Sequence, residues 1–282
     1  MRRDLDWDCR YVDAPDGCFD MEQLAEQLQD GPTSLISVMR VQNETGWIFP
    51  IPEIAQLRDE LAPGVPLHCD ATQAFCKMPV DPREWGVQLL TAGAHKIGGP
   101  RGIGILYVQR GLPMHTTAFG GNQERGLRSG TEPVFLAVGM AEAVRITAAH
   151  METDMEYAAS LRERAIEGLK REIPDAVVHA PEGGSPYILS VSVPGLPNVV
   201  SVKYLSGRRV CVSRASACEE NHTTVAPGAW RPKHPLALQA AGIPLREGKE
   251  TLRVSFFHQN TPEDVDRFVT VLAQCAREMR ES

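Results

Sequence analysis

The chain has neither an excess of basic residues nor a long apolar run. Its 282 residues include 29 lysines and arginines against 36 aspartates and glutamates, for a formal net charge of −7. A general nucleic-acid binder carries a basic surface, so no nucleic-acid partner is predicted. No apolar stretch approaches the roughly 20 residues that a membrane helix needs, and no apolar signal segment opens the sequence. These absences predict a cytoplasmic protein that does not engage a membrane.

Paired cysteines are missing as well. The seven cysteines are spread along the chain, and none forms a C-x-x-C pair. Their number is odd and the setting is predicted to be intracellular, so a disulfide framework is not expected. His68, Cys69 and Cys76 could be read as metal ligands, but the paired spacing of zinc sites is absent and no metal site is predicted. Most cysteines are interpreted as small core residues, with Cys218 as the exception.

Internal repeats and low-complexity tracts are also absent, and strands alternate with helices instead. Short apolar runs predict strands near residues 35–41, 66–70, 89–94 and 103–108. Helices are predicted from Asp20, near Pro52 and from Pro133. This alternation predicts an α/β fold, with a mainly parallel sheet that helices cover on both faces. We place this large domain at residues 1–150.

The composition changes near residue 150. A charged helix is predicted from about Met151 to Arg171, and the final helix is marked by Thr261 as its cap and Asp264 in its first turn. Strands are predicted at residues 187–193, 209–213 and 251–257. Residues 151–282 are therefore expected to form a small α+β domain. The long polar loop at residues 219–235 is of a kind that is either functional or mobile.

Two side chains with complementary chemistry follow neighbouring predicted strands. Asp70 ends one strand, at the place where open α/β sheets bind ligands, and Lys96 follows the next. A partly desolvated lysine can form an imine with an aldehyde cofactor, and an aspartate favours a protonated pyridine nitrogen. Each residue alone is more simply read as a turn aspartate or a solvated loop lysine. The glycine-rich segment 98–102 lets the backbone approach a ligand, and together these features are what pyridoxal phosphate (PLP) chemistry requires.

An ordered set of short motifs runs along the chain. They are Asn43-Glu44-Thr45-Gly46, Asp70-Ala71-Thr72-Gln73, Ala94-His95-Lys96, Gly126-Leu127-Arg128-Ser129-Gly130-Thr131, Ser216-Ala217-Cys218 and Leu252-Arg253-Val254-Ser255. In this order they resemble the cysteine desulfurases of the NifS/IscS type, which are class V, fold-type I PLP enzymes. The resemblance covers residues 8 to 275 and implies that the first domain is an incomplete fold-type I large domain.

The resemblance also implies a role for each matched residue. Lys96 would bind PLP covalently and move protons, and the Cys218 thiolate would act as the nucleophile on a loop. Asp70 would pair with the pyridinium, Gln73 and Asn43 would contact the cofactor's ring oxygen or the substrate, and His95 would hydrogen-bond the phosphate. Thr131 resembles a threonine that reaches the phosphate of the neighbouring subunit in a homodimer. Arg253 matches the arginine that clamps the substrate carboxylate, a task that suits its fork of donors.

The implied reaction converts L-cysteine to L-alanine. Cys218 takes the substrate sulfur as a persulfide and passes it to an acceptor protein, for example in iron–sulfur cluster assembly, which requires an accessible thiolate. A selenocysteine lyase or another class V aminotransferase-like enzyme is an alternative. A non-catalytic binding protein or persulfide carrier is a second alternative. A loop thiol without a role is the simpler interpretation of Cys218 taken alone.

The chain departs from the family pattern in three places. Gly93 stands where the family usually has a serine whose hydroxyl binds phosphate, and Ser213-Arg214-Ala215 replaces a Ser-Ser-Gly. The family also has a segment of roughly 100 residues ahead of this point, with further strands, a Gly-Ala-Thr phosphate loop and a stacking histidine. Without that segment, sheet edges would be left unpaired. The chain is therefore expected to be one half of a split enzyme, a fragment or an inactive homologue, and a partner is expected to supply the other segment in the first case.

Overall fold

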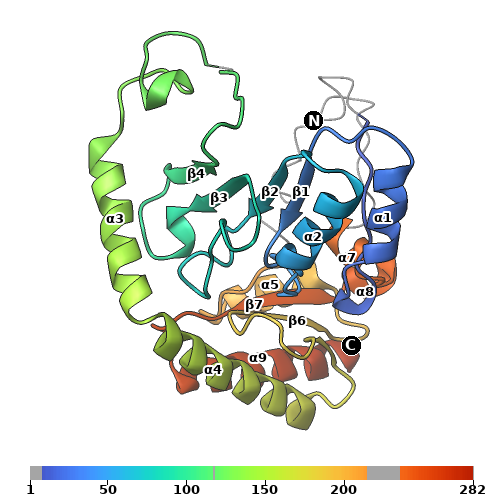
Figure 1. Cartoon of the computed structure of the whole chain (residues 1–282). Helices are drawn as coiled ribbons and strands as arrows, with labels where there is room; N and C mark the ends of the chain where they lie inside the picture. The colour runs from blue at the N-terminus through green and yellow to red at the C-terminus, as the bar shows by residue number, and fades with distance from the viewer. Residues whose placement is uncertain (1–7, 117, 215–235, 282) are drawn as a thin grey trace, which may run out of the picture. The chain divides into compact units, whose positions relative to one another are not determined.

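The computed structural model describes residues 8–116, 118–214 and 236–281, and the chain divides into two units (Figure 1). The first, here called the mixed-sheet unit, comprises residues 28–40 and 50–152. The second, the antiparallel-sheet unit, comprises the residues before 28, residues 41–49 and those from 153 onwards. The segment 41–49, which contains Asn43, thus groups with the C-terminal part of the chain rather than with the strands that flank it.

Four strands form the sheet of the mixed-sheet unit. They are β1 (Ile36–Met39), β2 (Leu67–Asp70), β3 (Leu89–Gly93) and β4 (Gly104–Val108), in the order β1-β2-β3-β4. The pairs β1–β2 and β2–β3 are parallel, whereas β4 runs antiparallel to β3. The fully buried side chains of Leu67 and Cys69 show why the second run becomes an interior strand. The predicted α/β class with a mainly parallel sheet is confirmed.

Prolines mark the starts of two long helices in this unit. Helix α2 (Ile51–Leu61) follows Pro50 and carries another proline in its first turn, while α3 (Val134–Ala149) follows Pro133. Ile51 and Ile54 of α2 are fully buried. Helix α1 (Met21–Gln29) precedes β1 in the chain, and α4 (Met151–Glu172) follows α3. Within the described ranges no helix alone is long and apolar enough to cross a membrane. The bent pair α3–α4 passes that test of length and composition only when taken together.

A buried arginine links α2 by hydrogen bonds to the segments that directly precede β2 and β3. The guanidinium of Arg58, whose side chain is 3% exposed, donates hydrogen bonds to the carbonyl oxygens of Val65 and Gly86 and to Gln88 Oε1 at 2.6–2.9 Å. Gln88 Oε1 also accepts from the backbone N–H of Leu67 at 2.9 Å. One side chain therefore satisfies acceptors on two segments that precede the strands, and it fixes where those strands begin.

Replacing this arginine should destabilise the mixed-sheet unit. The substitution Arg58→Met keeps the apolar stem but leaves the carbonyl of Val65 without this donor, at a cost of about 1–3 kcal/mol. It also removes one of the two donors to Gln88 Oε1 and one of the two donors to the carbonyl of Gly86. We expect the free energy of unfolding in urea to fall by about 2–4 kcal/mol. Gln56→Ala, on the exposed side of the same helix, should change it by less than about 0.5 kcal/mol. Equal effects from the two variants would contradict this assignment.

The antiparallel-sheet unit has a three-stranded sheet packed against helices. Its strands are β5 (Val177–His179), β6 (Ile188–Ser192) and β7 (Thr251–Ser255), with β6 in the centre. Its helices include most of α1 and α4 together with α5 (Asn198–Ser206), α7 (Leu236–Ala240), α8 (Leu245–Gly248) and α9 (Pro262–Arg280). Helix α9 begins with a capping box between Thr261 and Asp264, as the sequence predicts.

One predicted strand of this unit does not form. Residues 209–213 contribute a single bridge, between Ser213 and Arg253, instead of a strand. Arg209 has a φ of 61°, in the left-handed region, and it turns the chain where an extended backbone was expected. The prediction of a strand at residues 209–213 is therefore wrong.

Candidate active site

Asp70 and Lys96 lie at the same end of the sheet, where the parallel strands β2 and β3 finish. The strands β2 and β3 are parallel, with Asp70 opposite Thr91, so the connections that follow them emerge together. Asp70 is the last residue of β2, and Lys96 ends the short 3-10 helix η2 (Ala94–Lys96) directly after β3. Both side chains are half-buried. The amine and the carboxylate that the sequence singles out are thus brought to one end of the sheet.

The turn after β2 orients the carboxylate of Asp70. The backbone N–H of Thr72 donates a hydrogen bond to Asp70 Oδ1 at 2.9 Å, which is the pattern of an Asx turn. Gln73 lies half-buried in the same turn. A carboxylate oriented by its own backbone loses less side-chain entropy when it meets a cationic ligand group. This turn therefore fixes the direction of the Asp70 carboxylate.

A row of hydrogen-bonding side chains crosses the sheet beside Asp70. Ser37 Oγ lies 2.8 Å from His68 Nδ1, and His68 Nε2 lies 3.1 Å from Thr91 Oγ1, so the row joins three strands. His68 is two residues before Asp70 and points to the same face of the sheet. Burial lowers the pKa of His68 below its usual value, and the charge of Asp70 opposes that shift. The imidazole is therefore held in its neutral form.

This row gives the protein a defined sensitivity to acid. Because the pKa of His68 is lower in the folded chain than in the unfolded chain, its contribution to stability is complete above the unfolded value of about 6.5 and is lost as the pH falls below it. His68→Gln removes the titrating group but keeps a donor and an acceptor. We expect urea unfolding to show a smaller loss of stability between pH 7.5 and 5.5 in this variant than in the wild type. An unchanged loss would mean that His68 does not carry the effect.

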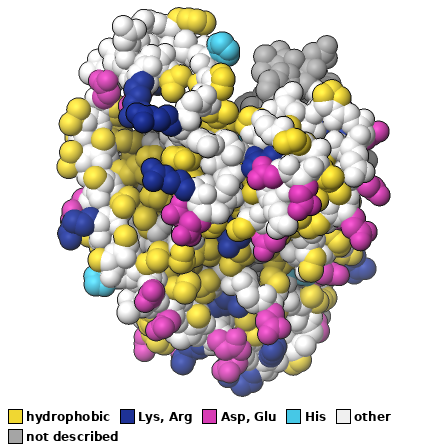
Figure 2. Space-filling model, viewed as in Figure 1, with side chains coloured by type: hydrophobic (Ala, Val, Ile, Leu, Met, Phe, Trp, Pro, Cys, Tyr) yellow, Lys and Arg dark blue, Asp and Glu magenta, His cyan; other side chains and the backbone are white. Residues whose placement is uncertain are grey.

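Basic side chains gather around Lys96. Burial lowers the pKa of His95, and the charges of Lys96, Arg101 and Lys77 lower it further. Lys77 is 7% exposed, and burial together with the charge of Lys96 lowers its pKa to about 8. Figure 2 shows lysine and arginine side chains in the region of β3 and β4. Positive charges held this close together favour the binding of an anion such as a phosphate group.

Two members of this basic cluster, Lys77 and Arg101, were not among the predicted site residues. The sequence holds a signal for each. Lys77 lies between the apolar residues Cys76 and Met78, where a lysine needs a reason to be buried, and Arg101 lies within the glycine-rich segment after Lys96. Their proximity to His95 comes from the fold of two connections and could not be read from their spacing.

Arg253 and Asn43 meet in the antiparallel-sheet unit. Arg253 lies on β7, and its backbone exchanges two hydrogen bonds with Ser213 at 2.7 and 3.1 Å. Its guanidinium donates to the carbonyl oxygen of Asn43 and to Ser213 Oγ, both at 3.2 Å. The loop that holds Asn43 is shaped by Gln42, whose Oε1 accepts from the backbone N–H groups of Glu44 and Thr45 at 2.6 Å. The arginine is thereby fixed in the middle of β7, beside a loop that the side chain of Gln42 holds by hydrogen bonds.

The remaining predicted site residues are not brought into these groups by the described contacts. Thr131 lies in an exposed segment before α3. Cys218 and the loop at residues 219–235 lie outside the described residues. The roles predicted for all these residues stay predictions.

The chain matches the model of a known protein family. The model of the aminotransferase class V family matches residues 7–268. The chain belongs to this family. It is 32% identical over 266 residues to a cysteine desulfurase of Nostoc sp. (strain PCC 7120), and the match covers 94% of this chain and 63% of that protein. It is 33% identical over 269 residues to the mitochondrial cysteine desulfurase of Arabidopsis thaliana, with 94% and 56% covered.

Solved structures agree with the family assignment. A NifS-like protein superposes on the chain with a TM-score of 0.82 at 30% identity, covering 94% of this chain and 67% of that one. The resemblance to cysteine desulfurases and the NifS-like fold are therefore confirmed. The chain spans about 63% of the length of the Nostoc relative. More than a third of that class V protein thus has no counterpart among the residues matched here.

The residues at the carboxyl ends of β2 and β3 fit the cofactor of class V enzymes. An amine, a carboxylate and a basic cluster match the aldehyde, the ring nitrogen and the phosphate of PLP respectively. The glycine in place of the family's serine also has a visible consequence. A Cβ atom added at Gly93 would lie 3.1 Å from Cε1 of His95 and 3.2 Å from its Nδ1. The imidazole of His95 therefore occupies the space beside residue 93, and a serine there would require the ring to move.

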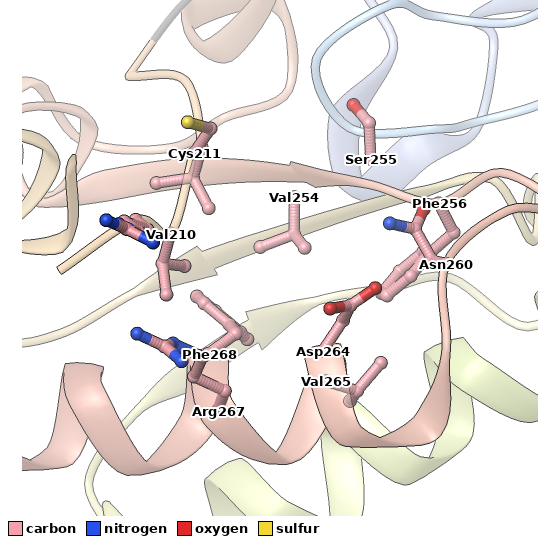
Figure 3. A pocket seen from close by; sticks show the side chains of 12 residues that line it. Val210, Cys211, Val254, Ser255, Phe256, Asn260, Asp264, Val265, Arg267 and Phe268 are labelled. Carbon is pink, nitrogen blue, oxygen red and sulfur yellow. The ribbon is translucent and has the colours of Figure 1, made fainter.

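A pocket of about 240 Å³ lies elsewhere in this class V chain, between β7, the segment 209–212 and the start of α9 (Figure 3). Its walls are mixed in character: Val210, Val254, Phe256 and Phe268 are apolar, whereas Arg209, Arg267 and Asp264 are charged. None of the predicted site residues lines it. The pocket is therefore a separate feature that the sequence did not indicate.

Proposed function

We propose that the chain carries the catalytic residues of a PLP-dependent cysteine desulfurase, which converts L-cysteine to L-alanine and passes the sulfur to an acceptor protein. The observation that carries the proposal is that Lys96, Asp70 and the basic cluster all follow the carboxyl ends of the parallel strands β2 and β3. The relatives at 32–33% identity support it, because they bear the name cysteine desulfurase. The activity belongs to the protein in which the part of the relatives not matched here is also present.

The mixed-sheet unit holds the cofactor in this proposal. The amine of Lys96 would hold the cofactor covalently, and once the amino group of the substrate has displaced it, the freed amine would take the proton from the substrate α-carbon. Asp70 keeps the ring nitrogen protonated, and His95 with the basic cluster holds the phosphate. Gln73 contacts the ring oxygen, and Thr131 binds a phosphate across a dimer. Bound PLP supplies an electron sink for the substrate's α-carbon.

The antiparallel-sheet unit supplies the substrate and sulfur steps. The guanidinium of Arg253 donates hydrogen bonds to the α-carboxylate of L-cysteine, and Asn43 at its side contacts the substrate or the cofactor ring oxygen. The thiolate of Cys218 attacks the substrate sulfur, the C–S bond breaks and the sulfur stays on Cys218 as a persulfide. This step requires a deprotonated and accessible thiol.

The persulfide step can be tested with two cysteine variants. With the PLP-loaded protein and L-cysteine, Cys218→Ala should lower alanine formation by about 10²-fold or more, because it removes the nucleophile. It should also abolish the protein-bound persulfide that mass spectrometry detects in the wild type. Cys211→Ala, at an exposed cysteine seven residues earlier, is the control and should retain both. Full alanine formation in Cys218→Ala would instead favour a lyase without a persulfide, such as a selenocysteine lyase.

A further inference from the structure

One pocket of the antiparallel-sheet unit takes no part in the proposed desulfurase function. It has a volume of about 240 Å³ and lies between the edge of β7, the segment 209–212 and the start of α9, all within this unit. Pockets that hold drug-sized ligands usually measure about 300–1,000 Å³. This pocket, here called the β7–α9 pocket, is therefore suited to a smaller molecule.

The pocket exists because the segment before Ser213 does not pair with β7. Ser213 forms an antiparallel bridge with Arg253, and continued pairing in that register would place Cys211 opposite Ser255. Arg209 has a left-handed backbone, with a φ of 61°, so the segment that follows it does not run along β7 in an extended form. A gap therefore stays open beside Ser255.

The backbone of Ser255 faces this gap. The next residue, Phe256, donates its N–H to the carbonyl of Tyr187, which directly precedes β6. Successive residues of an antiparallel strand direct their backbone groups to opposite sides, so the N–H and C=O of Ser255 are directed away from β6. No hydrogen bond joins these two groups to any other residue that the structure describes. One donor and one acceptor are thus available to a ligand at the strand edge.

The floor of the β7–α9 pocket is apolar. Val254, Phe256 and Phe268 line the pocket, and all three are buried side chains. An apolar group placed on such a floor leaves water, which favours binding. A strongly hydrated group placed there would lose its water contacts without gaining hydrogen bonds. We therefore expect the ligand to carry an apolar group.

Charged groups of opposite sign stand on two sides of this floor. Arg209 and Arg267 line the pocket together with Asp264 and Asn260. In the view of Figure 3, Arg267 lies to the left, whereas Asp264 and Asn260 lie to the right. The pocket thus offers positive charge at one side and negative charge at the other.

Hydrogen bonds to the backbone hold both charged groups in place. Nη2 of Arg267 donates to the carbonyl of Arg208 at 2.9 Å, and Asp264 Oδ2 accepts from the N–H of Thr261 at 3.0 Å. These bonds use only part of what each group offers, because a guanidinium has five N–H donors and a carboxylate has two oxygens. Both charges are therefore oriented and still able to bind a ligand.

We propose that the β7–α9 pocket binds a free apolar α-amino acid in its zwitterionic form. Its carboxylate binds Arg267 and accepts from the N–H of Ser255, and its ammonium group binds Asp264 and donates to the C=O of Ser255. Its side chain lies on the apolar floor. A phosphate or a fatty acid fits less well, because neither supplies a cation for Asp264.

The inference does not depend on the proposed desulfurase function. The lining of the β7–α9 pocket includes neither Lys96 nor Arg253. An amino acid held here is therefore a second one beside the proposed substrate, and it binds without PLP. A chain without turnover would still bind it.

The test uses the whole 282-residue chain, free of PLP, with L-leucine and L-phenylalanine as probes. Isothermal titration calorimetry should show saturable binding of at least one of them, with a Kd below about 10 mM. L-Serine has the same charges without the apolar group and should bind at least tenfold more weakly. Hydrogen exchange of the Ser255 amide should slow when the probe is bound. With PLP added, the affinity and the absorbance of the cofactor should both stay unchanged.

Matched variants and ligand analogues locate the two charges. Asp264→Asn keeps an acceptor for the N–H of Thr261 but loses the charge, and Arg267→Met loses the guanidinium. Each should weaken the binding of L-leucine at least tenfold. N-acetyl-L-leucine, which lacks the ammonium group, should bind at least tenfold more weakly than L-leucine, and Asp264→Asn should not weaken it further. Isopentylamine lacks the carboxylate and should show the same relation to Arg267→Met. Arg277→Met, at an exposed position near the end of α9, is the control and should bind as the wild type does.

Several results would overturn the proposal. They are the absence of saturable binding for both probes, binding of N-acetyl-L-leucine as tight as that of L-leucine, and wild-type affinity in Asp264→Asn or Arg267→Met. Binding that requires PLP, or that shifts the absorbance of the cofactor, would place the amino acid at the cofactor and would overturn it as well. If Asp264→Asn proved less stable by urea unfolding, Arg267→Met and the two analogues would still decide the question.

Discussion

Lys96→Ala should abolish both the visible absorption band of bound PLP and the turnover of L-cysteine. Lys96 lies at the end of η2, which directly follows β3. The amine of Lys77 lies near it but is buried and belongs to the connection after β2. The loss removes the covalent attachment and the group that moves the proton, so we expect activity to fall by about 10³-fold or more. Absorbance spectra and alanine formation measure the two effects on the same sample.

Two further variants separate nucleophilicity from charge. Lys96→Arg retains a cation within the basic cluster but cannot form the covalent link, because a guanidinium stays protonated. It should therefore hold PLP weakly through its phosphate, without the band, and should show no turnover. Lys170→Ala, at an exposed position of α4, should behave as the wild type. Activity of Lys96→Arg near that of the wild type would show that Lys96 contributes only its charge, and the proposed function would fail.

The sequence predicted the sheet well because its signals there are local. The interior strands are short apolar runs between turns, and Asp70 and Lys96 stand directly after two of them. Because the two strands pair in parallel, both residues then lie at the same end of the sheet, and no other contact has to be known to predict this. Thr261 as the cap of α9 is a local signal of the same kind, and it was confirmed as well.

What the sequence did not reveal depends on contacts between distant segments. The burial of Lys77 beside Lys96 follows from the way two connections pack, and spacing along the chain does not encode it. The sequence pattern at residues 209–213 predicted a strand, but the left-handed backbone of Arg209 turns the chain at the first of these residues, and no strand forms. Likewise, the grouping of residues 41–49 with the antiparallel-sheet unit places Asn43 against Arg253, 210 residues away in the chain.

The predicted unpaired sheet edges are a different case. The resemblance predicted them but did not say where they lie. Among the described residues β4 pairs only with β3, and its side chains Ile105 and Leu106 are 40% and 51% exposed.

Asp70→Asn should leave the fold and PLP binding nearly intact and yet remove most of the activity. The amide oxygen of asparagine can still accept the hydrogen bond from the N–H of Thr72 that Asp70 Oδ1 accepts at 2.9 Å. The turn is therefore kept, and only the negative charge is lost. Without that charge the ring nitrogen is no longer held in its protonated form, and the cofactor withdraws electrons from the substrate less strongly.

We expect kcat to fall by about 10²–10³-fold in this variant, a loss of about 3–4 kcal/mol of transition-state stabilisation. The midpoint of urea unfolding should stay near that of the wild type. Asp70→Ala is the comparison, since it removes the turn acceptor as well as the charge and should lower both stability and cofactor retention. If Asp70→Asn turned over L-cysteine at the wild-type rate while still binding PLP, the carboxylate would serve only the Asx turn. Its place as the counterion of the ring nitrogen would then be refuted, even with Lys96 confirmed as the attachment site.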